Sequence, residues 1–349
     1  MELTFDKKTI FLLTGAFGHL GNVVTRQLLE KGARVRALIL PNDLSDERFR
    51  FPVELFRGDL RNIESIKLAF AHHGDEQLVV IHMASIISTL SSNFKRLYQT
   101  NVVGTRNILD LAVENKAVRF VYVSSVHALI EEPWGTINRE RIDFDPKAVH
   151  GVYAKSKAMA SRLILSYRDR LNLVILHPSG IIGPYDYQYS QTNQVFYDFL
   201  KGKLPLVIKG GYDFVDVRDV ASGVIAATQN GIPGENYILS GRYVTIDEMM
   251  KVVSGYARKK RPKVLPLWIA RMVAPFVEAW SHLTRKRPLF TPYSLYTTSS
   301  NGHFSHDKAT KAFGYAPRSI EATIYDIYRW YYDYVLAPRA LPSIKKKYL

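Results

Sequence analysis

Short apolar runs alternate with amphipathic segments through the first half of the chain, and this alternation limits the fold more than any other feature. The runs are rich in Val, Ile, Leu and Phe, and the segments between them have the apolar spacing of helices. We expect strands at residues 9–15, 34–40, 53–56, 78–82, 119–123 and 172–176, and helices at 19–31, 63–72, 94–115 and 153–167. Strand–helix units joined by short loops predict a doubly wound, parallel α/β sheet with helices on both faces.

The alternation breaks down after Pro178, which predicts a smaller second lobe. We expect residues 206–230 to return to the main sheet and to form the first domain together with residues 1–180. Residues 181–205 and 231–349 are expected to form a discontinuous C-terminal substrate lobe with a basic tail. The chain has no cysteine, which excludes disulfides and a cysteine nucleophile. No metal site is expected, because His303 and His306 have no third ligand near them in sequence.

A glycine-rich loop, TGAFGHLG, joins the first expected strand to the first expected helix. Gly15 permits the tight turn, Gly18 lets the backbone approach a pyrophosphate, and Gly21 lets the helix and strand pack closely. The helix N-terminus then faces the phosphates with free N–H groups and the positive end of its dipole. Because a strand precedes this loop and a helix follows it, the sequence predicts a dinucleotide-binding site.

A tyrosine and a lysine four residues apart open the helix expected before the sixth strand. Tyr153 and Lys157 share one face of that helix. We expect the Lys157 ammonium to lower the pKa of Tyr153 from its usual value of about 10. The tyrosine hydroxyl is then suited to general acid–base chemistry near neutral pH.

These motifs resemble the extended short-chain dehydrogenase/reductase superfamily, the NAD-dependent epimerase/dehydratase group. Further matches are the Gly58–Leu60 turn, the His82–Ser85 element, Asn101 and the Val123–Ser125 strand end. The resemblance implies hydride transfer between a nicotinamide and a carbonyl or carbinol carbon, with Ser125, Tyr153 and Lys157 as catalytic residues. It also implies a Rossmann-type cofactor site formed by Gly15, Phe17, Gly18, His19, Leu20, Gly21, Asp59, Leu60, Met83, Ala84, Ser85, Asn101, Ser124, Tyr153, Lys157, Pro178 and Ile181.

The end of the second expected strand bears on the choice between NAD and NADP. NADP users often carry an arginine there for the 2′-phosphate, and NAD users an acid for the ribose diol. Leu40 and Ile39 stand at those positions. Asn42 or Asp43 could still reach a diol, so we expect NAD and keep NADP as an alternative.

The segment His177–Pro184 bears on the substrate. Nucleotide-sugar epimerases of the superfamily usually have an asparagine where Gly180 stands. The segment is closer to the dihydroflavonol-reductase-like and 3β-hydroxysteroid-dehydrogenase-like branches, which implies a small, mainly apolar ketone or alcohol. Ser125, His127, Tyr185 and Tyr189 are the candidate substrate residues. The alternatives are a sugar or nucleotide-sugar epimerase or dehydratase, and a non-catalytic NAD(P)-sensing protein.

The net charge of +15 is concentrated in the last quarter of the chain. Residues 258–349 hold 17 Lys and Arg against 5 Asp and Glu, a net of +12. No nucleic-acid-binding motif accompanies this charge, so no nucleic-acid partner is expected. Basic residues flank an apolar segment, residues 264–283. This pattern fits a buried lid or dimer helix with solvated flanks, and it also permits the hypothesis of a helix lying on an anionic membrane. We expect a cytoplasmic protein, with membrane association at the inner face and homodimerisation as hypotheses.

Overall fold

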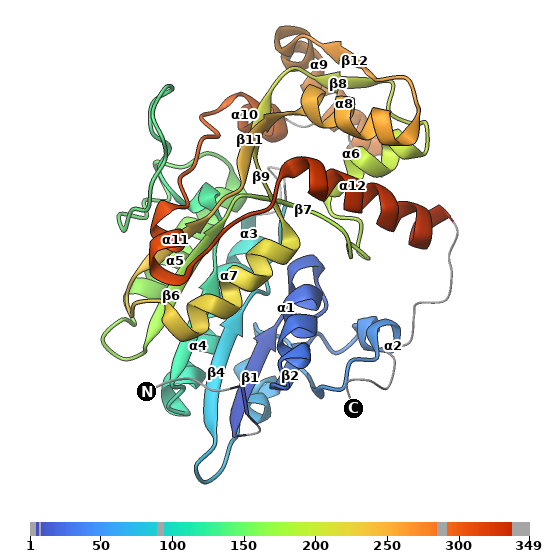
Figure 1. Ribbon diagram of the computed structural model, residues 1–349. Coiled ribbons are helices and arrows are strands. Elements are labelled where there is room, and N and C mark those ends of the chain that lie inside the picture. Colours follow the sequence, from blue (N-terminus) through green and yellow to red (C-terminus); the bar gives the residue numbers. More distant parts are fainter. Residues whose placement is uncertain (1–4, 7, 89–93, 285–291, 337–349) are drawn as a thin grey trace.

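The structure, a computed structural model, describes residues 5–6, 8–88, 94–284 and 292–336. Its base is a seven-stranded parallel sheet with the strand order β10-β6-β5-β4-β1-β2-β3 (Figure 1). The order reverses direction at β1, as in doubly wound sheets, so the predicted fold class is confirmed. The strands are β1 (Thr9–Thr14), β2 (Arg34–Ile39), β3 (Glu54–Arg57), β4 (Gln77–His82), β5 (Arg119–Val123), β6 (Leu173–Pro178) and β10 (Asn236–Leu239).

Helices cover both faces of this sheet. One face carries α1 (His19–Glu30), α7 (Val217–Asn230) and α11 (Asp307–Phe313); the other carries α4 (Gly104–Glu114) and α5 (Val152–Leu165) (Figure 1). Successive side chains of a strand point to opposite faces. In β1, Ile10 and Leu12 therefore join the core under α4 and α5. Phe11 and Leu13 join the core under α1 and α7. Because both faces are buried, the strand is apolar throughout.

Two helices expected from the sequence are interrupted. Residues 63–72 form two short 3-10 turns, Ile63–Ser65 and Lys67–Phe70. Residues 94–115 are divided into α3 (Phe94–Tyr98), a π-helical turn (Gln99–Val103) and α4. Such widened turns are rare and often occur at functional sites. Apolar periodicity alone gives no sign of either interruption.

The second lobe lies beyond the carboxyl ends of the main strands (Figure 1). Its described residues form a three-stranded sheet, a two-stranded sheet and five helices. Their bounds are β7 (Gly180–Ile182), β9 (Gly211–Asp216) and β11 (Arg242–Thr245); β8 (Leu206–Ile208) and β12 (Lys263–Leu265); and α6 (Gln191–Leu200), α8 (Ile246–Ala257), α9 (Leu267–Thr284), α10 (Pro292–Ser299) and α12 (Ile320–Tyr331). A short helix, α2 (Ser45–Phe49), follows β2.

The lobes are divided along the chain differently from our expectation. Of residues 206–230, only α7 packs on the main sheet, because β8 and β9 belong to the two smaller sheets. The seventh main strand is β10, which comes from the region assigned to the second lobe and pairs with β6. Its apolar residues Tyr237, Ile238 and Leu239 are fully buried, which accounts for its place in the main sheet. No helix in the described part of the chain is long and apolar enough to cross a membrane.

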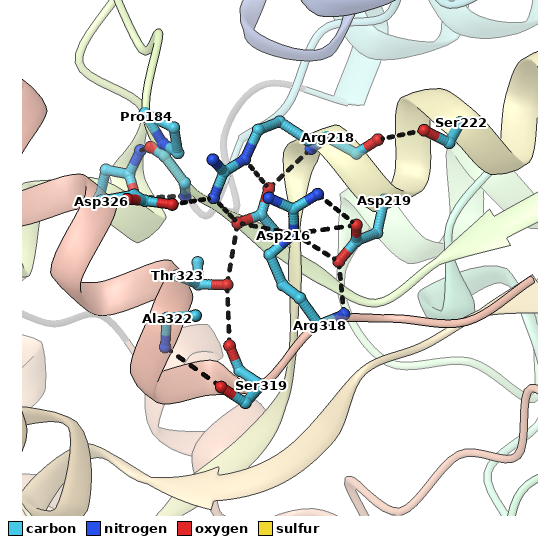
Figure 2. Close-up of polar contacts among 12 residues, drawn as sticks. Pro184, Asp216, Arg218, Asp219, Ser222, Arg318, Ser319, Ala322, Thr323 and Asp326 are labelled. Carbon is cyan, nitrogen blue, oxygen red and sulfur yellow. Dashed lines mark hydrogen bonds and ion pairs between the residues drawn. The ribbon is translucent and has the colours of Figure 1, made fainter.

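A network of ion pairs joins the two lobes where β9 runs into α7 (Figure 2). The buried Asp216 carboxylate accepts hydrogen bonds from Arg218 at 2.7–2.9 Å and from the Thr323 hydroxyl of α12 at 2.9 Å. Arg218 also bonds Asp326 of α12 at 2.6 Å. Arg318, just before α12, pairs with Asp219 at 2.7 Å. Helix α12 is thereby fixed to the start of α7.

Candidate active site

The glycine loop between β1 and α1 has the geometry of a phosphate cradle. Gly15 has φ +70°, a value that favours glycine, and its carbonyl accepts a hydrogen bond from Gly18 N at 3.1 Å. A Cβ atom on Gly21 would lie 1.9 Å from the Gly15 carbonyl oxygen, so the helix and loop pack as closely as predicted. Helix α1 begins at His19 and directs its first N–H groups to this loop. These residues therefore fit the diphosphate of a dinucleotide.

A cavity of about 740 Å³ extends from this loop into the second lobe, above the carboxyl ends of the strands. Ligands of doubly wound proteins bind at this edge of the sheet. The cavity brings together most of the residues predicted for the site. Those that line it are Gly15, Gly18, His19, Leu20, Gly21, Met83, Ser85, Ser124, Ser125, His127, Tyr153, Pro178, Ile181 and Tyr189.

Six residues predicted for the cofactor site do not line the cavity: Phe17, Asp59, Leu60, Ala84, Asn101 and Lys157. Phe17 is buried in a stack with Phe49. The Asp59 carboxylate pairs with Arg61, and the hydrogen bond from Arg61 holds its pKa below the usual range. Leu60 is buried in the core, and Ala84 packs against Gly15. The sequence motifs therefore locate the right turns, but neighbouring groups engage these side chains.

Asn101 and Tyr185 also lie outside the cavity lining. The Asn101 amide donates to the Ile86 carbonyl at 3.0 Å and to the Ser156 hydroxyl at 3.1 Å, and it accepts from Ile86 N at 2.8 Å. It thereby ties the loop after β4 to α5, which makes it a positioning residue. The Tyr185 ring packs under the Arg26 guanidinium, 5.2 Å from the ring centre, instead of facing the substrate space.

Tyr153 and Ser125 meet at the cavity wall. Tyr153 lies in the first turn of α5, and Ser125 precedes the short turn Val126–Ala128 after β5. Burial raises the pKa of Tyr153 to about 12, while a hydrogen bond with Ser125 acts in the opposite direction. The tyrosine is therefore a neutral phenol that can donate a proton. This corrects our expectation that Lys157 lowers its pKa.

The Lys157 ammonium explains that difference. Its Nζ atom donates to the Val123 carbonyl at 2.9 Å and to the Tyr122 hydroxyl at 3.3 Å, and it lies 4.8 Å from the centre of the Tyr122 ring. Burial lowers the pKa of Lys157 to about 7. The side chain lies behind the cavity wall and holds the end of β5, which carries Ser125, against α5.

Two buried histidines position the same strand ends. His177 Nδ1 donates to the Ser125 carbonyl at 3.1 Å, and burial lowers its pKa to about 4. His82 lies between the Thr14 and Thr105 hydroxyls at 2.7 and 2.9 Å, and its pKa is lowered to about 3. Both rings are neutral at pH 7, so without adding charge His177 ties β6 to the segment after β5, and His82 ties β4 to β1 and α4.

The second lobe supplies a large part of the cavity wall, and most of these residues were not predicted from the sequence. Tyr212 from β9 stacks on His127 with ring centres 5.5 Å apart, and Tyr293 from α10 lies 5.9 Å from His127. Apolar residues complete this end of the cavity: Val195, Leu204, Leu206, Val207, Ile208, Phe214, Ile246 and Met249. No local motif marks them, because they converge only when the small sheets assemble. Among the described lining residues there is no Lys or Arg.

The sequence profile of the NAD dependent epimerase/dehydratase family matches residues 11–240 of the chain. The chain belongs to this family. Its members are enzymes of the short-chain dehydrogenase/reductase type, and the cofactor of this chain is NAD. The glycine cradle and the cavity beside it fit that group. In the described part of the chain, no three His, Asp or Glu side chains gather as metal ligands.

Similar proteins cover almost the whole chain. Sterol demethylase protein B of Methylococcus capsulatus is 30% identical over 92% of this chain and 97% of its own length. A putative dihydroflavonol 4-reductase of Synechocystis is 28% identical over 93% of this chain and 95% of its own length. The decarboxylating sterol-4-alpha-carboxylate 3-dehydrogenase of Mus musculus is 26% identical over 87% of this chain and 85% of its own length.

Solved structures agree with the fold. The crystal structure of gox2253 is 30% identical, with a TM-score of 0.79 over 93% of this chain and 98% of that one. A Thermus thermophilus UDP-glucose 4-epimerase in complex with NAD is 22% identical, with a TM-score of 0.72 over 93% and 100%. The predicted resemblance to the dihydroflavonol-reductase-like and 3β-hydroxysteroid-dehydrogenase-like branch is confirmed by these relatives.

Proposed function

We propose that the protein is an NAD-dependent oxidoreductase that interconverts a carbonyl and a hydroxyl group on a mainly apolar, sterol-like substrate. The observation that carries this proposal is the pairing of Tyr153 with Ser125 in the wall of a cavity whose far end is apolar. Small-molecule sites combine an apolar lining with a few placed polar groups in this way. The names of the sterol-related relatives support the substrate class.

NAD, when bound, supplies or accepts the hydride. The chain's own residues handle the oxygen and its proton. In the reducing direction, the neutral Tyr153 hydroxyl donates its proton to the carbonyl oxygen as negative charge develops there. The Ser125 hydroxyl holds the same oxygen and stabilises its developing charge. Lys157 and His177 keep the strand end that carries Ser125 in place.

The charge of the cavity favours this substrate over a nucleotide sugar. A nucleotide sugar would add a second diphosphate to the one that the glycine loop fits, and guanidinium, ammonium or metal partners would favour its binding. The described lining residues offer no Lys or Arg, and Gly180 stands where nucleotide-sugar epimerases of the superfamily usually have an asparagine. An epimerase of nucleotide sugars is therefore the weaker alternative. A non-catalytic NAD-sensing role is weaker still, because Ser125, Tyr153 and Lys157 are all present.

The Tyr153→Phe variant tests the assigned catalytic role. We expect turnover of ketosteroid or hydroxysteroid probes to fall by at least about 100-fold, the usual contribution of a general acid or base. Because the ring remains, NADH should bind with unchanged affinity, measured by nicotinamide fluorescence. Full turnover in this variant would refute the role of Tyr153.

We also propose that helix α9 rests on an anionic membrane at the cytoplasmic face. Its buried side packs through Ala270 and Ala274 against Leu295 of α10. Trp268, Met272 and Phe276, spaced four residues apart, leave 63%, 60% and 76% of their surface exposed. The exposed basic residues Lys259, Lys260, Arg261 and Arg271 lie close by in sequence. Arg285, Lys286, Arg287 and the basic tail at 337–349 lie outside the described residues.

A helix with an apolar face flanked by Lys and Arg is typical of proteins that bind the membrane surface. Such a contact would bring the second lobe, which supplies part of the cavity wall, close to an apolar substrate dissolved in lipid. A homodimer through α4 and α5 remains a separate proposal. Light scattering in solution tests it: the mass of two chains supports a dimer, and the mass of one chain refutes it.

A further inference from the structure

A second tyrosine, Tyr293 of α10, contributes to the cavity wall from the second lobe. Its hydroxyl oxygen is shielded from solvent and has no hydrogen-bond partner in the described part of the chain. Folded proteins pair nearly all of their buried polar groups, because an unpaired one costs about 1–3 kcal/mol. An unpartnered buried hydroxyl on the wall of a ligand cavity therefore points to a partner atom on the ligand.

The Tyr293 ring is held against the catalytic helix. Gly151, immediately before α5, has φ +89° and no side chain, and a Cβ atom there would lie 2.3 Å from Tyr293 Cε2. The ring also stacks with His150, with ring centres 6.4 Å apart. Because α5 carries Tyr153, the positions of the two tyrosines are linked through Gly151. The Tyr293 hydroxyl is thus a fixed feature of the site.

His127 lies beside both tyrosines. Its ring centre is 6.1 Å from that of Tyr153 and 5.9 Å from that of Tyr293. The Tyr212 hydroxyl lies 3.4 Å from His127 Nδ1. Burial lowers the pKa of His127 to about 4, so the imidazole is neutral at pH 7. This end of the cavity therefore combines uncharged hydrogen-bonding groups with the catalytic hydroxyl.

We propose that Tyr293 binds a second oxygen of the substrate, an uncharged hydroxyl or carbonyl oxygen close to the reacting carbon. The inference rests on the proposed function and narrows its substrate class. An uncharged oxygen fits because the described lining residues include no Lys or Arg, and a buried carboxylate without a cation is strongly disfavoured. A site that donates a hydrogen bond to such an oxygen discriminates against analogues that lack it.

Three matched probes test this inference: a 3β-hydroxysteroid, the same steroid with a hydroxyl on the neighbouring carbon, and the same steroid with a carboxylate there. Their affinities for the enzyme–NADH complex are measured by the change in nicotinamide fluorescence. In wild type the dihydroxy probe should bind most tightly. Tyr293→Phe should weaken its binding about 10-fold, the loss expected for one hydrogen bond. Binding of the unsubstituted steroid should not change.

Tyr296→Phe is the matched control. It removes the same atom from the same helix, but the Tyr296 hydroxyl already donates to Glu131 at 3.1 Å. This variant should leave unchanged the ratio of the affinity for the dihydroxy probe to the affinity for the unsubstituted steroid. Tyr293→Phe should reduce that ratio. If either substitution simply loosened α10, the affinities for all three probes would change by the same factor.

The outcomes separate this inference from the proposed reaction. If the dihydroxy probe loses affinity in Tyr293→Phe but no probe is turned over, the oxygen-binding site stands and the proposed reaction fails. If the probes are turned over and Tyr293→Phe changes none of the ratios, the inference fails alone. It also fails if the carboxylate probe binds wild type best, or if no probe binds at all.

Discussion

Burial determines the protonation of the groups around the reacting oxygen. Tyr153 is a neutral phenol and Lys157 has a pKa of about 7, because both lie away from water. The residue types and their spacing were readable from the sequence. Their partners were not: Lys157 bonds the end of β5 rather than the Tyr153 hydroxyl, since three-dimensional packing selects among all carbonyls and hydroxyls within reach.

The buried carboxyl group of Asp213 should make the stability of the protein depend on pH. The carboxyl group is 1% exposed and accepts hydrogen bonds from the Ser179 hydroxyl at 2.5 Å and from Gly241 N at 2.8 Å. Burial raises its pKa to about 7. Between the unfolded value near 4 and about 7, the folded state binds more protons than the unfolded state. The contribution of Asp213 to the free energy of unfolding therefore falls as pH rises through this range.

The Asp213→Asn variant should remove that dependence, because the amide oxygen accepts the same bonds without ionising. Relative to wild type, its free energy of unfolding should rise between pH 5 and pH 8, by at most ~3 kcal/mol. Urea unfolding at the two pH values measures this difference. Asp169→Asn, at a side chain 91% exposed, is the control and should show no comparable change. A constant difference between Asp213→Asn and wild type would contradict the argument.

At the scale of elements, the sequence predicted the strands of the first half well because each is a continuous apolar run buried on both faces. The prediction of strands failed where pairing with a segment distant in sequence determines the structure. Residues 236–239 form a short segment that follows an irregular stretch. They become a strand of the main sheet because they pair with the free edge of β6. The π turn around Asn101 likewise depends on contacts with Ile86 and Ser156, which are distant in sequence.

The ion-pair network that links α7 to α12 should stabilise the folded protein. Asp216→Ala removes the carboxylate that caps α7 and binds Thr323, and it leaves part of the charge on Arg218 unpaired (Figure 2). We expect a loss of about 3 kcal/mol in the free energy of unfolding, because breaking a buried ion pair is strongly destabilising. Urea denaturation measures it.

Glu321→Ala provides the comparison for that network. Its ion pair with Arg242 also joins α12 to the small sheet, at a similar distance of 2.9 Å, but both side chains are about half exposed. Exposed pairs contribute about 0–1 kcal/mol. Equal effects from Asp216→Ala and Glu321→Ala would mean that burial of the network does not stabilise the junction.

At the scale of the whole molecule, the basic charge and the cavity are separate features. The excess of Lys and Arg lies after residue 258, yet none of these side chains is among the described residues that line the cavity. The sequence located the charge but could not show that it avoids the substrate space. That separation favours an external anionic surface as the partner of the basic residues and an uncharged substrate beside the cofactor in the cavity.

The membrane proposal is tested by co-sedimentation with vesicles of phosphatidylcholine and phosphatidylglycerol at low salt. Replacing Trp268, Met272 and Phe276 by serine should reduce the bound fraction at least about 10-fold, because the buried apolar area drives such binding. Replacing Leu68, Trp134 and Ile142, which are similarly exposed elsewhere, should have no effect. Failure of the wild-type protein to sediment would end the proposal.

On the proposed function, this enzyme transfers hydride to or from an uncharged, apolar carbonyl or alcohol. The most direct measurement follows the absorbance of reduced nicotinamide while the purified protein is mixed with NAD(H) and a panel of hydroxysteroids, ketosteroids and UDP-sugars. We predict oxidation or reduction of at least one steroid, its loss in Tyr153→Phe, and no reaction with UDP-sugars. Conversion of a UDP-sugar, with no change in any steroid, would contradict the account.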